Sequence, residues 1–349
     1  MFMIGVQGGT LNRDERLIIE ECGFGGFILF AHNCREPKQI LWLCRALWET
    51  GTEFPPFIGI DQEGGRVHRL PKPFSHFPSA GRVGEKGNPY LASRTGRAAA
   101  AELSLLGINL NFAPVLDVDS NPENPIIGDR AFGGAPEQVI RFAWPYAEGL
   151  RDGGVIPCGK HFPGHGATDE DSHLALPIVE KSLAELKAVE LPPFVHACRQ
   201  GIETLMTAHV LYRALDQEFP GTLSERIVSG LLRQDLGYDG VVFSDDMGMK
   251  AIGANYGEEE ATGLAVRAGI DVLLFCHELS RAMRVYEFLC AEAERDPAVR
   301  VRVEESYRRI TQLKNRRLRA FTGGDETEIA KRLALLDHRR IVEEIQSSL

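Results

Sequence analysis

Short runs of apolar residues recur along the whole chain, and each is followed by a turn and then by a segment with helical spacing of its apolar positions. Several runs hardly alternate between apolar and polar residues, which is typical of parallel strands covered on both faces. The predicted strands are 2–6, 26–30, 57–60, 109–113, 155–159, 204–207, 240–243 and 271–275. The predicted helices include 38–49, 89–106, 136–152, 183–200, 224–234, 258–268 and 279–294, with Ser224 at an N-cap position.

Strand and helix alternate about eight times within roughly 300 residues, which predicts an α/β fold of the (β/α)8 TIM-barrel type in a single domain. The alternative is an open, doubly wound sheet, but no G-x-G-x-x-G motif follows an early strand. The segment 300–349 has a charged, helical pattern, interrupted by Gly323 and Gly324. We therefore expect residues 1–295 to form the barrel and residues 296–349 to form helices that pack on its exterior.

The composition supports a large folded domain. The chain has 349 residues, of which 44% are hydrophobic and 25% are charged, and this excludes a disordered or fibrous protein. The formal net charge of −10 disfavours nucleic acid and anionic membrane surfaces as partners. The first residues lack a basic segment, no run reaches the roughly 18 apolar residues of a bilayer span, and the seven cysteines form no C-x-x-C pair. We expect no membrane segment, reduced cysteines and a cytoplasmic location.

Candidate chemistry gathers where the predicted strands end. In TIM barrels the active site lies at the carboxyl ends of the strands, where the connecting loops meet. The polar residues found directly after predicted strands are Asp61, Lys160, His161, His209 and Asp245. These side chains are therefore candidates for a shared site.

The segment GKHFPGHGATDEDSH, residues 159–173, has three interpretations. It is a polar surface loop, or a metal site in which His161 and His165 are ligands four residues apart, or a loop that carries an acid–base dyad. Pro163 disfavours the helix that a metal site with this spacing would need, and no H-x-H pair follows the first strand. In the third interpretation the carboxylate of Asp171 orients the imidazole of His173, which transfers the proton.

Two adjacent carboxylates occur in the segment SDDMGM, residues 244–249. Successive side chains on a strand point to opposite faces, so we expect one of Asp245 and Asp246 to face the barrel lumen, but the pattern does not say which. Such a pair is either solvated and caps a helix, or supplies a nucleophile for double displacement at an acetal carbon.

Two further segments contain charged residues in loops. In IDQEGGRVHR, residues 60–69, the charged side chains form an ion-paired turn, or Asp61 accepts hydrogen bonds from substrate hydroxyls. The charged residues of that turn are Asp61, Glu63, Arg66 and Arg69. In GDRAFG, residues 128–133, Arg130 is either solvated or part of a site.

Six segments, taken in order and spacing, resemble family 3 glycoside hydrolases, and within them the single-domain bacterial β-N-acetylglucosaminidases (β-hexosaminidases). They are IDQEGGRVHR, NLNFAPVLDV, GDRAFG, KHFPGHGATDEDSH, PGTLSERIVSGLLR and FSDDMGM. The resemblance extends from about Gly5 to Glu294. It implies a (β/α)8 barrel, without a metal or organic cofactor, that releases terminal N-acetylglucosamine from β-linked N-acetylglucosaminyl-anhydromuramoyl peptides during cell-wall recycling.

By motif position, the resemblance assigns Asp245 as the nucleophile, His173 as the general acid/base and Asp171 as the residue that orients it. It assigns sugar binding to Asp61, Arg69, Arg130, Lys160 and His161. Only 55 residues follow Glu294. They are too few for the second domain that supplies a carboxylate acid/base in family 3 β-glucosidases, so His173 must serve that role.

The chain departs from the family pattern at few positions. His68 stands where Gln is usual, and Met247 where Leu is usual. The tail beyond about Arg319 is outside the pattern, so the oligomeric state, a monomer or a weak homo-oligomer, stays open.

The sequence leaves four alternatives to a retaining β-N-acetylhexosaminidase. An N-acetylglucosaminide phosphorylase is one, because a neutral histidine dyad does not repel phosphate as a carboxylate would. Another family 3 β-glycosidase is a second, a catalytically silent sugar-binding barrel is a third, and a metal-dependent barrel hydrolase is the last.

Overall fold

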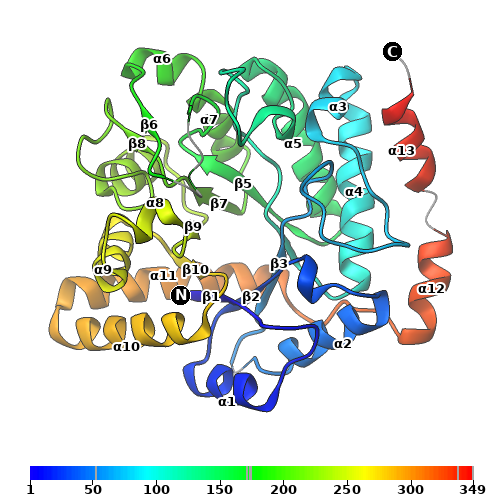
Figure 1. The fold of residues 1–349 in the computed structure, drawn as a ribbon, viewed down its shortest axis with the longest axis horizontal. Coiled ribbons are helices and arrows are strands. Elements are labelled where there is room, and N and C mark those ends of the chain that lie inside the picture. The colour runs from blue at the N-terminus through cyan, green and yellow to red at the C-terminus, as the bar shows by residue number, and fades with distance from the viewer. Residues whose placement is uncertain (52, 170–171, 173–174, 336–337, 348–349) are drawn as a thin grey trace.

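The computed structural model describes residues 1–51, 53–169, 172, 175–335 and 338–347. Among these residues, eight parallel strands close into a barrel in the order β1-β10-β9-β7-β5-β4-β3-β2 (Figure 1). Their bounds are β1 Phe2–Gly5, β2 Gly26–Leu29, β3 Phe57–Ile60, β4 Leu110–Asn111, β5 Ile156–Phe162, β7 Thr204–Thr207, β9 Val241–Asp246 and β10 Val272–Phe275. Each overlaps a predicted strand, and the TIM-barrel fold is confirmed.

Helices surround the barrel, and a short two-stranded sheet lies outside it (Figure 1). The first helices are α1 Arg13–Cys22, α2 Pro37–Trp48, α3 Ala80–Glu85, α4 Pro89–Leu105, α5 Pro136–Asp152, α6 Leu183–Ala188 and α7 Leu191–Arg199. They are followed by α8 Lys250–Gly253, α9 Glu258–Ala268, α10 Leu279–Arg295, α11 Pro297–Arg317, α12 Glu326–Leu335 and α13 His338–Gln346. The small sheet pairs β6 Ile178–Val179 with β8 Leu211–Tyr212.

Two of the predicted helices have a different form in the structure. The predicted helix 183–200 is two helices, α6 and α7, because Pro192 and Pro193 lack the N–H groups that would continue the hydrogen-bond ladder from α6. Ser224 does act as a cap, since its Oγ accepts a hydrogen bond of 3.1 Å from the backbone N of Ile227. The segment that it begins, Arg226–Asp235, winds as a π-helix.

Apolar side chains form an inner core inside the barrel and an outer core between strands and helices. The inner core includes Phe57, Phe112 and Phe243, whose rings pack edge to face at centroid distances of 5.9 and 5.6 Å. Ile310 and Leu313 of α11 belong to the same inner core, so α11 covers one end of the barrel. No described helix is long and apolar enough to cross a membrane.

The last two helices lie at one side of the molecule (Figure 1). α12 packs against α2, and α13 packs against α3 and α4. His338 at the start of α13 is buried, and its Nδ1 lies 2.8 Å from Oε1 of Glu102 on α4. This buried contact ties the tail to the helical layer around the barrel.

Candidate active site

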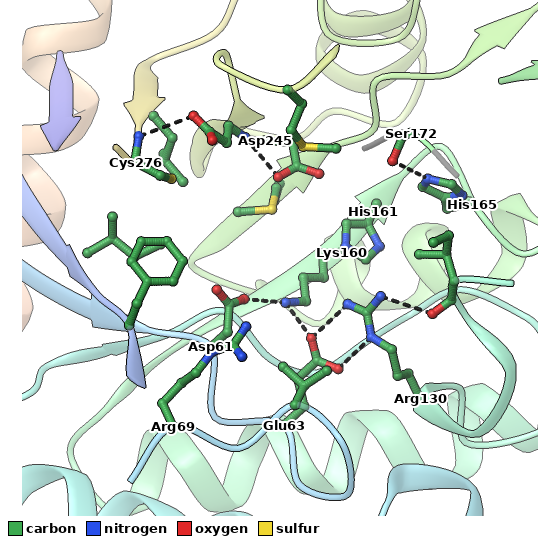
Figure 2. A pocket seen from close by; sticks show the side chains of 18 of the residues that line it. Asp61, Glu63, Arg69, Arg130, Lys160, His161, His165, Ser172, Asp245 and Cys276 are labelled. Carbon is green, nitrogen blue, oxygen red and sulfur yellow. Dashed lines mark hydrogen bonds and ion pairs between the residues drawn. The ribbon is translucent and has the colours of Figure 1, made fainter. Parts of the chain in front are cut away.

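A cavity of about 220 Å³ lies where the barrel strands end (Figure 2). Six residues predicted from sequence border it, namely Asp61, Arg69, Arg130, Lys160, His161 and Asp245. Asp171 and His173 lie outside the described residues, whereas Ser172 between them borders the cavity. The structure therefore brings together the predicted residues that it describes, although they are far apart in the sequence.

The cavity floor is a network of paired charges (Figure 2). Nζ of Lys160 at the end of β5 lies 2.6 Å from Oδ1 of Asp61 and 2.6 Å from Oε1 of Glu63, and the lysine is only 2% exposed. Arg130 donates two hydrogen bonds to Glu63, from Nη2 to Oε1 at 2.8 Å and from Nε to Oε2 at 2.9 Å. This bidentate geometry fixes the arginine beside the cavity.

Burial and charge pairing compete in this network. Burial alone would lower the pKa of Lys160, but the carboxylates of Asp61 and Glu63 outweigh it and hold that pKa above its usual range. Burial alone would raise the pKa of Glu63, but Arg130 and Lys160 hold it far below the usual range. Lys160 and Glu63 therefore remain charged around neutral pH.

The interpretation of residues 60–69 as a turn whose charged side chains pair with one another is wrong for its two carboxylates. Asp61 and Glu63 pair with Lys160 and Arg130 from other elements, because the turn directs these carboxylates into the barrel mouth. Arg66 points outward instead, and its Nη2 donates to the backbone O of Ile126 and of Ile127.

Arg69 is held by its backbone while its side chain borders the cavity. Its backbone N donates to Oε1 of Gln62 at 2.8 Å. Its Nε is buried and has no hydrogen-bond partner within the described part of the chain. A buried donor without a partner is costly, so Arg69 is suited to receive an oxygen atom of a ligand.

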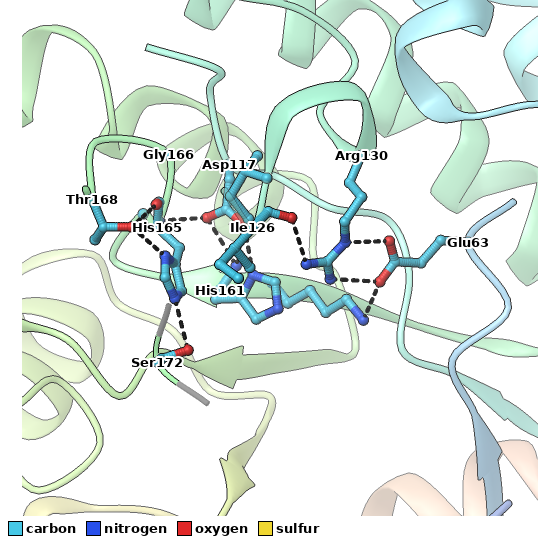
Figure 3. Close-up of polar contacts among 12 residues, drawn as sticks. Glu63, Asp117, Ile126, Arg130, His161, His165, Gly166, Thr168 and Ser172 are labelled. Carbon is cyan, nitrogen blue, oxygen red and sulfur yellow. Dashed lines mark hydrogen bonds and ion pairs between the residues drawn. The ribbon is translucent and has the colours of Figure 1, made fainter. Parts of the chain in front are cut away.

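His161 is oriented by a buried carboxylate that the sequence did not single out (Figure 3). Asp117 is fully buried, and its Oδ2 lies 2.6 Å from Nδ1 of His161. Its Oδ1 also accepts the backbone N–H groups of His161 and His165, at 3.1 and 2.7 Å. Because an ionised carboxylate only accepts, Nδ1 of His161 carries a proton and donates it to Asp117.

The carboxylate of Asp117 stays ionised in this setting. Burial alone would raise its pKa, but His161, and then His165 with its backbone N–H, hold the pKa below the usual value. The signal for Asp117 in the sequence was weak, since it is a single acidic residue within the apolar run NFAPVLDV.

His165 does not share a ligand set with His161. Its Nδ1 lies 2.9 Å from Oγ1 of Thr168 and its Nε2 lies 3.1 Å from Oγ of Ser172 (Figure 3). Burial lowers the pKa of His165 to about 4, so the ring is neutral. The spacing of the two histidines thus serves hydrogen bonding, and no group of three or more His, Cys, Asp or Glu side chains suited to a metal ion occurs within the described residues.

Asp245 and Asp246 both border the cavity, whereas we expected one carboxylate to face away. The reason is that β9 ends here and the chain turns. Oδ1 of Asp246 accepts the backbone N–H groups of Gly248 and Cys276, at 3.0 and 3.1 Å. Oδ1 of Asp245 accepts one bond of 2.8 Å, from the backbone N of Asp246. Among the described contacts, Asp245 is therefore the less restrained carboxylate.

The surroundings of Asp245 favour its charged form. Burial alone would raise its pKa, but His209 and His161, the backbone N–H of Asp246, and Lys160 outweigh it and hold the pKa below the usual value. His209 is itself buried, with Nε2 3.0 Å from the backbone O of Asp246 and Nδ1 2.8 Å from Oγ1 of Thr222. A carboxylate in this state is suited to attack an electrophilic carbon.

A parallel barrel with an ionised carboxylate at a strand end, facing buried polar groups that can bind hydroxyls, is suited to the hydrolysis of glycosidic bonds. Residues 1–313 match the glycosyl hydrolase family 3 N-terminal domain. The chain belongs to glycosyl hydrolase family 3 and is a glycoside hydrolase.

Individual relatives agree with this assignment. A β-hexosaminidase of Thiobacillus denitrificans is 37% identical over 281 residues, which cover 79% of this chain and 77% of the relative. The structure of a family 3 β-N-acetylglucosaminidase from Paenibacillus sp. FPU-7 superposes with a TM-score of 0.88 at 38% identity, covering 98% of this chain and 67% of that one. The structure of NagZ from Neisseria gonorrhoeae, in complex with N-trifluoroacetyl-D-glucosamine, superposes with a TM-score of 0.76 at 30% identity, covering 96% of each chain.

Proposed function

We propose that the chain is a retaining exo-β-N-acetylglucosaminidase, a β-N-acetylhexosaminidase that removes terminal, non-reducing N-acetylglucosamine. Relatives that are β-hexosaminidases support the type of sugar. The observation that carries the proposal is the ionised carboxylate of Asp245, which has one backbone hydrogen bond and borders a cavity floored by paired charges.

In this function Asp245 is the nucleophile. Its carboxylate forms a bond to the anomeric carbon while the bond from that carbon to the leaving oxygen breaks, and the leaving oxygen takes a proton from His173. Water then attacks the glycosyl-enzyme, with His173 as the base, and the second inversion restores the β-configuration. Asp171 orients His173, and both assignments rest on the family resemblance because these residues lie outside the described part of the chain.

The sugar is held by the charged floor. Asp61 has one oxygen bound to Lys160 and a second that can accept from a hydroxyl, while Lys160, Arg69 and Arg130 supply donors. His161, whose ring Asp117 orients through Nδ1, borders the same cavity and is placed to bind the sugar. None of these contacts needs a metal ion or an organic cofactor.

The natural substrate follows from the same resemblance. It is a cell-wall muropeptide fragment with terminal N-acetylglucosamine β-linked to an anhydromuramoyl peptide, and the setting is peptidoglycan recycling in the cytoplasm by a monomer or weak homo-oligomer. The structural similarity to NagZ, which was solved in complex with N-trifluoroacetyl-D-glucosamine, supports the terminal sugar of this substrate.

Hydrolysis of a chromogenic β-N-acetylglucosaminide and of the matching β-glucoside, measured side by side, tests the function. We expect a clear preference for the N-acetylglucosaminide and a β-configured first product by NMR. A preference for the glucoside contradicts the sugar assignment, an α-product contradicts double displacement, and sugar 1-phosphate formed on addition of phosphate identifies a phosphorylase.

A further inference from the structure

One side of the cavity carries aromatic rings, beside the carboxylate of Asp246, whose Oδ2 lies 3.8 Å from Nε2 of His277. Phe30 follows β2, His277 follows β10, and both border the cavity. Their ring centroids lie 5.4 Å apart, with 29° between the planes. His32 also stacks on Phe30, at 6.0 Å and 7°. Since β10 and β2 are the two neighbours of β1, the contact between Phe30 and His277 spans the end of β1.

The position of Phe30 is fixed by a buried amide. Asn33 is fully buried, and its Oδ1 accepts a bond of 2.8 Å from the backbone N of Phe30. Its Nδ2 donates to the backbone O of Val6 and of Gly8, at 3.0 and 2.9 Å. The segment that follows β2 is thereby tied to the segment that follows β1, and the phenyl ring is held at the cavity without help from a ligand.

The aromatic rings and the charged groups lie at different depths. The side chain of His277 is 68% exposed, whereas that of Lys160 is 2% exposed. The sugar that is cleaved must reach Asp245 and the buried groups, so the exposed rim remains for the group that leaves. Sugar rings have apolar C–H faces, which pack well on aromatic faces.

We propose that the exposed ring of His277, supported from behind by Phe30, forms a subsite that binds the ring of the leaving-group sugar by stacking. The proposal rests on the proposed glycosidase function and adds to it the residues that select the leaving group. A substrate whose leaving group has no ring cannot use the subsite, so loss of the subsite should not lower its kcat/KM.

The test compares two substrates of the purified full-length protein. One is the disaccharide in which a second N-acetylglucosamine is the leaving group, and the other is methyl β-N-acetylglucosaminide. For Phe30→Ala and for His277→Ala we expect the ratio of kcat/KM for the disaccharide to kcat/KM for the methyl glycoside to fall about 3- to 10-fold. His277→Phe keeps a ring face and should keep most of the ratio.

Tyr90→Ala is the matched control, since Tyr90 is an exposed aromatic residue of α4 that does not border the cavity. It should leave the ratio unchanged. Thermal unfolding shows whether each variant is folded, and if Phe30→Ala is not, the exposed residue His277 decides the result.

Two results overturn the subsite. An equal loss on both substrates, with weaker inhibition by free N-acetylglucosamine, places the rings against the cleaved sugar. An unchanged ratio in both alanine variants shows that the rings bind no leaving group. If the wild-type protein prefers β-glucosides, the proposed sugar is wrong, and the same comparison with cellobiose and methyl β-glucoside still tests the subsite.

Discussion

Asp245 and Asp246 are adjacent in the sequence, but backbone N–H groups restrain them differently. Two N–H groups bind Oδ1 of Asp246, and one binds Oδ1 of Asp245. A carboxylate that is already bound by two amides is a weaker nucleophile and is less free to reach a substrate. This difference belongs to the turn after β9 and is not present in the residue pattern.

The first prediction follows for the nucleophile. Asp245→Ala should lower kcat by at least about 10³-fold, because a covalent intermediate can no longer form, while the protein stays folded. Asp246→Ala is the matched variant and should cost activity mainly through a changed turn. The check is kcat on an aryl N-acetylglucosaminide together with circular dichroism, and a larger loss in Asp246→Ala would reverse the assignment.

His173 carries the second prediction, which separates its roles as acid and base. His173→Ala should lower kcat/KM by about 10²-fold or more on an alkyl glycoside, and far less on a dinitrophenyl glycoside, whose leaving group needs no proton. Deglycosylation still needs the base, so the glycosyl-enzyme should accumulate. Azide should restore turnover and give the β-azide, with Asp171→Ala showing a milder form of the same pattern.

Equal losses on both substrates without rescue by azide would exclude His173 from this role. So would an α-configured azide product, since two inversions retain configuration.

Lys160 carries the third prediction, which concerns pH. Histidine and lysine neighbours hold the pKa of Asp245 below its usual value. In Lys160→Met one positive charge is lost, so the pKa of Asp245 rises, and the carboxylate becomes protonated at a higher pH than before. The acid limb of the kcat/KM profile should therefore move to higher pH, in addition to a loss of sugar binding. An acid limb that stays in place in Lys160→Met would show that another group sets it.

At the scale of elements, the sequence predicted the barrel well because its strands are short apolar runs that the fold buries on both faces. β3 is one example, since all four of its residues are buried. The sequence analysis missed α1, whose segment RDERLIIEEC is mostly charged and gives only a narrow apolar face. Its start is marked by local chemistry instead, because Asn12 and Glu15 form a capping box.

Asp271 joins several elements at the end of the barrel that α11 covers. Its carboxylate is fully buried and accepts from the backbone N of Val242 in β9 at 2.9 Å. It also accepts from Arg302 and Ser306 of α11, at 2.9 and 2.8 Å, and from Arg233 at 2.6 Å. A single carboxylate thus fixes α11 and the π-helical segment against the strands.

The fourth prediction is that Asp271→Asn lowers the free energy of unfolding by about 3–5 kcal/mol, because buried guanidinium groups lose their counter-charge. Asp152→Asn is the matched control. Asp152 pairs with Arg97 on the surface at 2.6 Å, and loss of that exposed pair should cost less than about 1 kcal/mol. Urea denaturation of both variants measures the difference, and equal effects would show that Asp271 does not anchor α11.

At the scale of the whole molecule, the residues that border the site could be predicted, but their partners could not. Lys160 and Asp61 are 99 positions apart, and Arg130 and Glu63 are 67 apart. The 44 positions between Asp117 and His161 likewise separate the buried carboxylate from the ring that it orients. Such contacts depend on how barrel closure brings the loops together, and the alternation of strands and helices does not specify loop geometry.

The tail is connected to the active-site side of the barrel through Glu102. This carboxylate of α4 accepts the backbone N–H of Ser75 with both oxygens, at 3.2 and 3.0 Å, and its Oε1 lies 2.8 Å from Nδ1 of His338 in α13. Ser75 belongs to the loop that also contains Arg69. The packing of α13 therefore helps to hold in place a loop that borders the cavity.

The fifth prediction is that His338→Ala lowers the free energy of unfolding by about 1–3 kcal/mol, because a buried carboxylate loses a hydrogen-bond partner. KM for an aryl N-acetylglucosaminide should rise as the loop around Ser75 loosens. Glu344→Ala is the matched control on α13, since its ion pair with Arg94 is partly exposed and should contribute less than about 1 kcal/mol. If His338→Ala and Glu344→Ala destabilise the protein equally and leave KM unchanged, the contact with Glu102 does not connect the tail to the site.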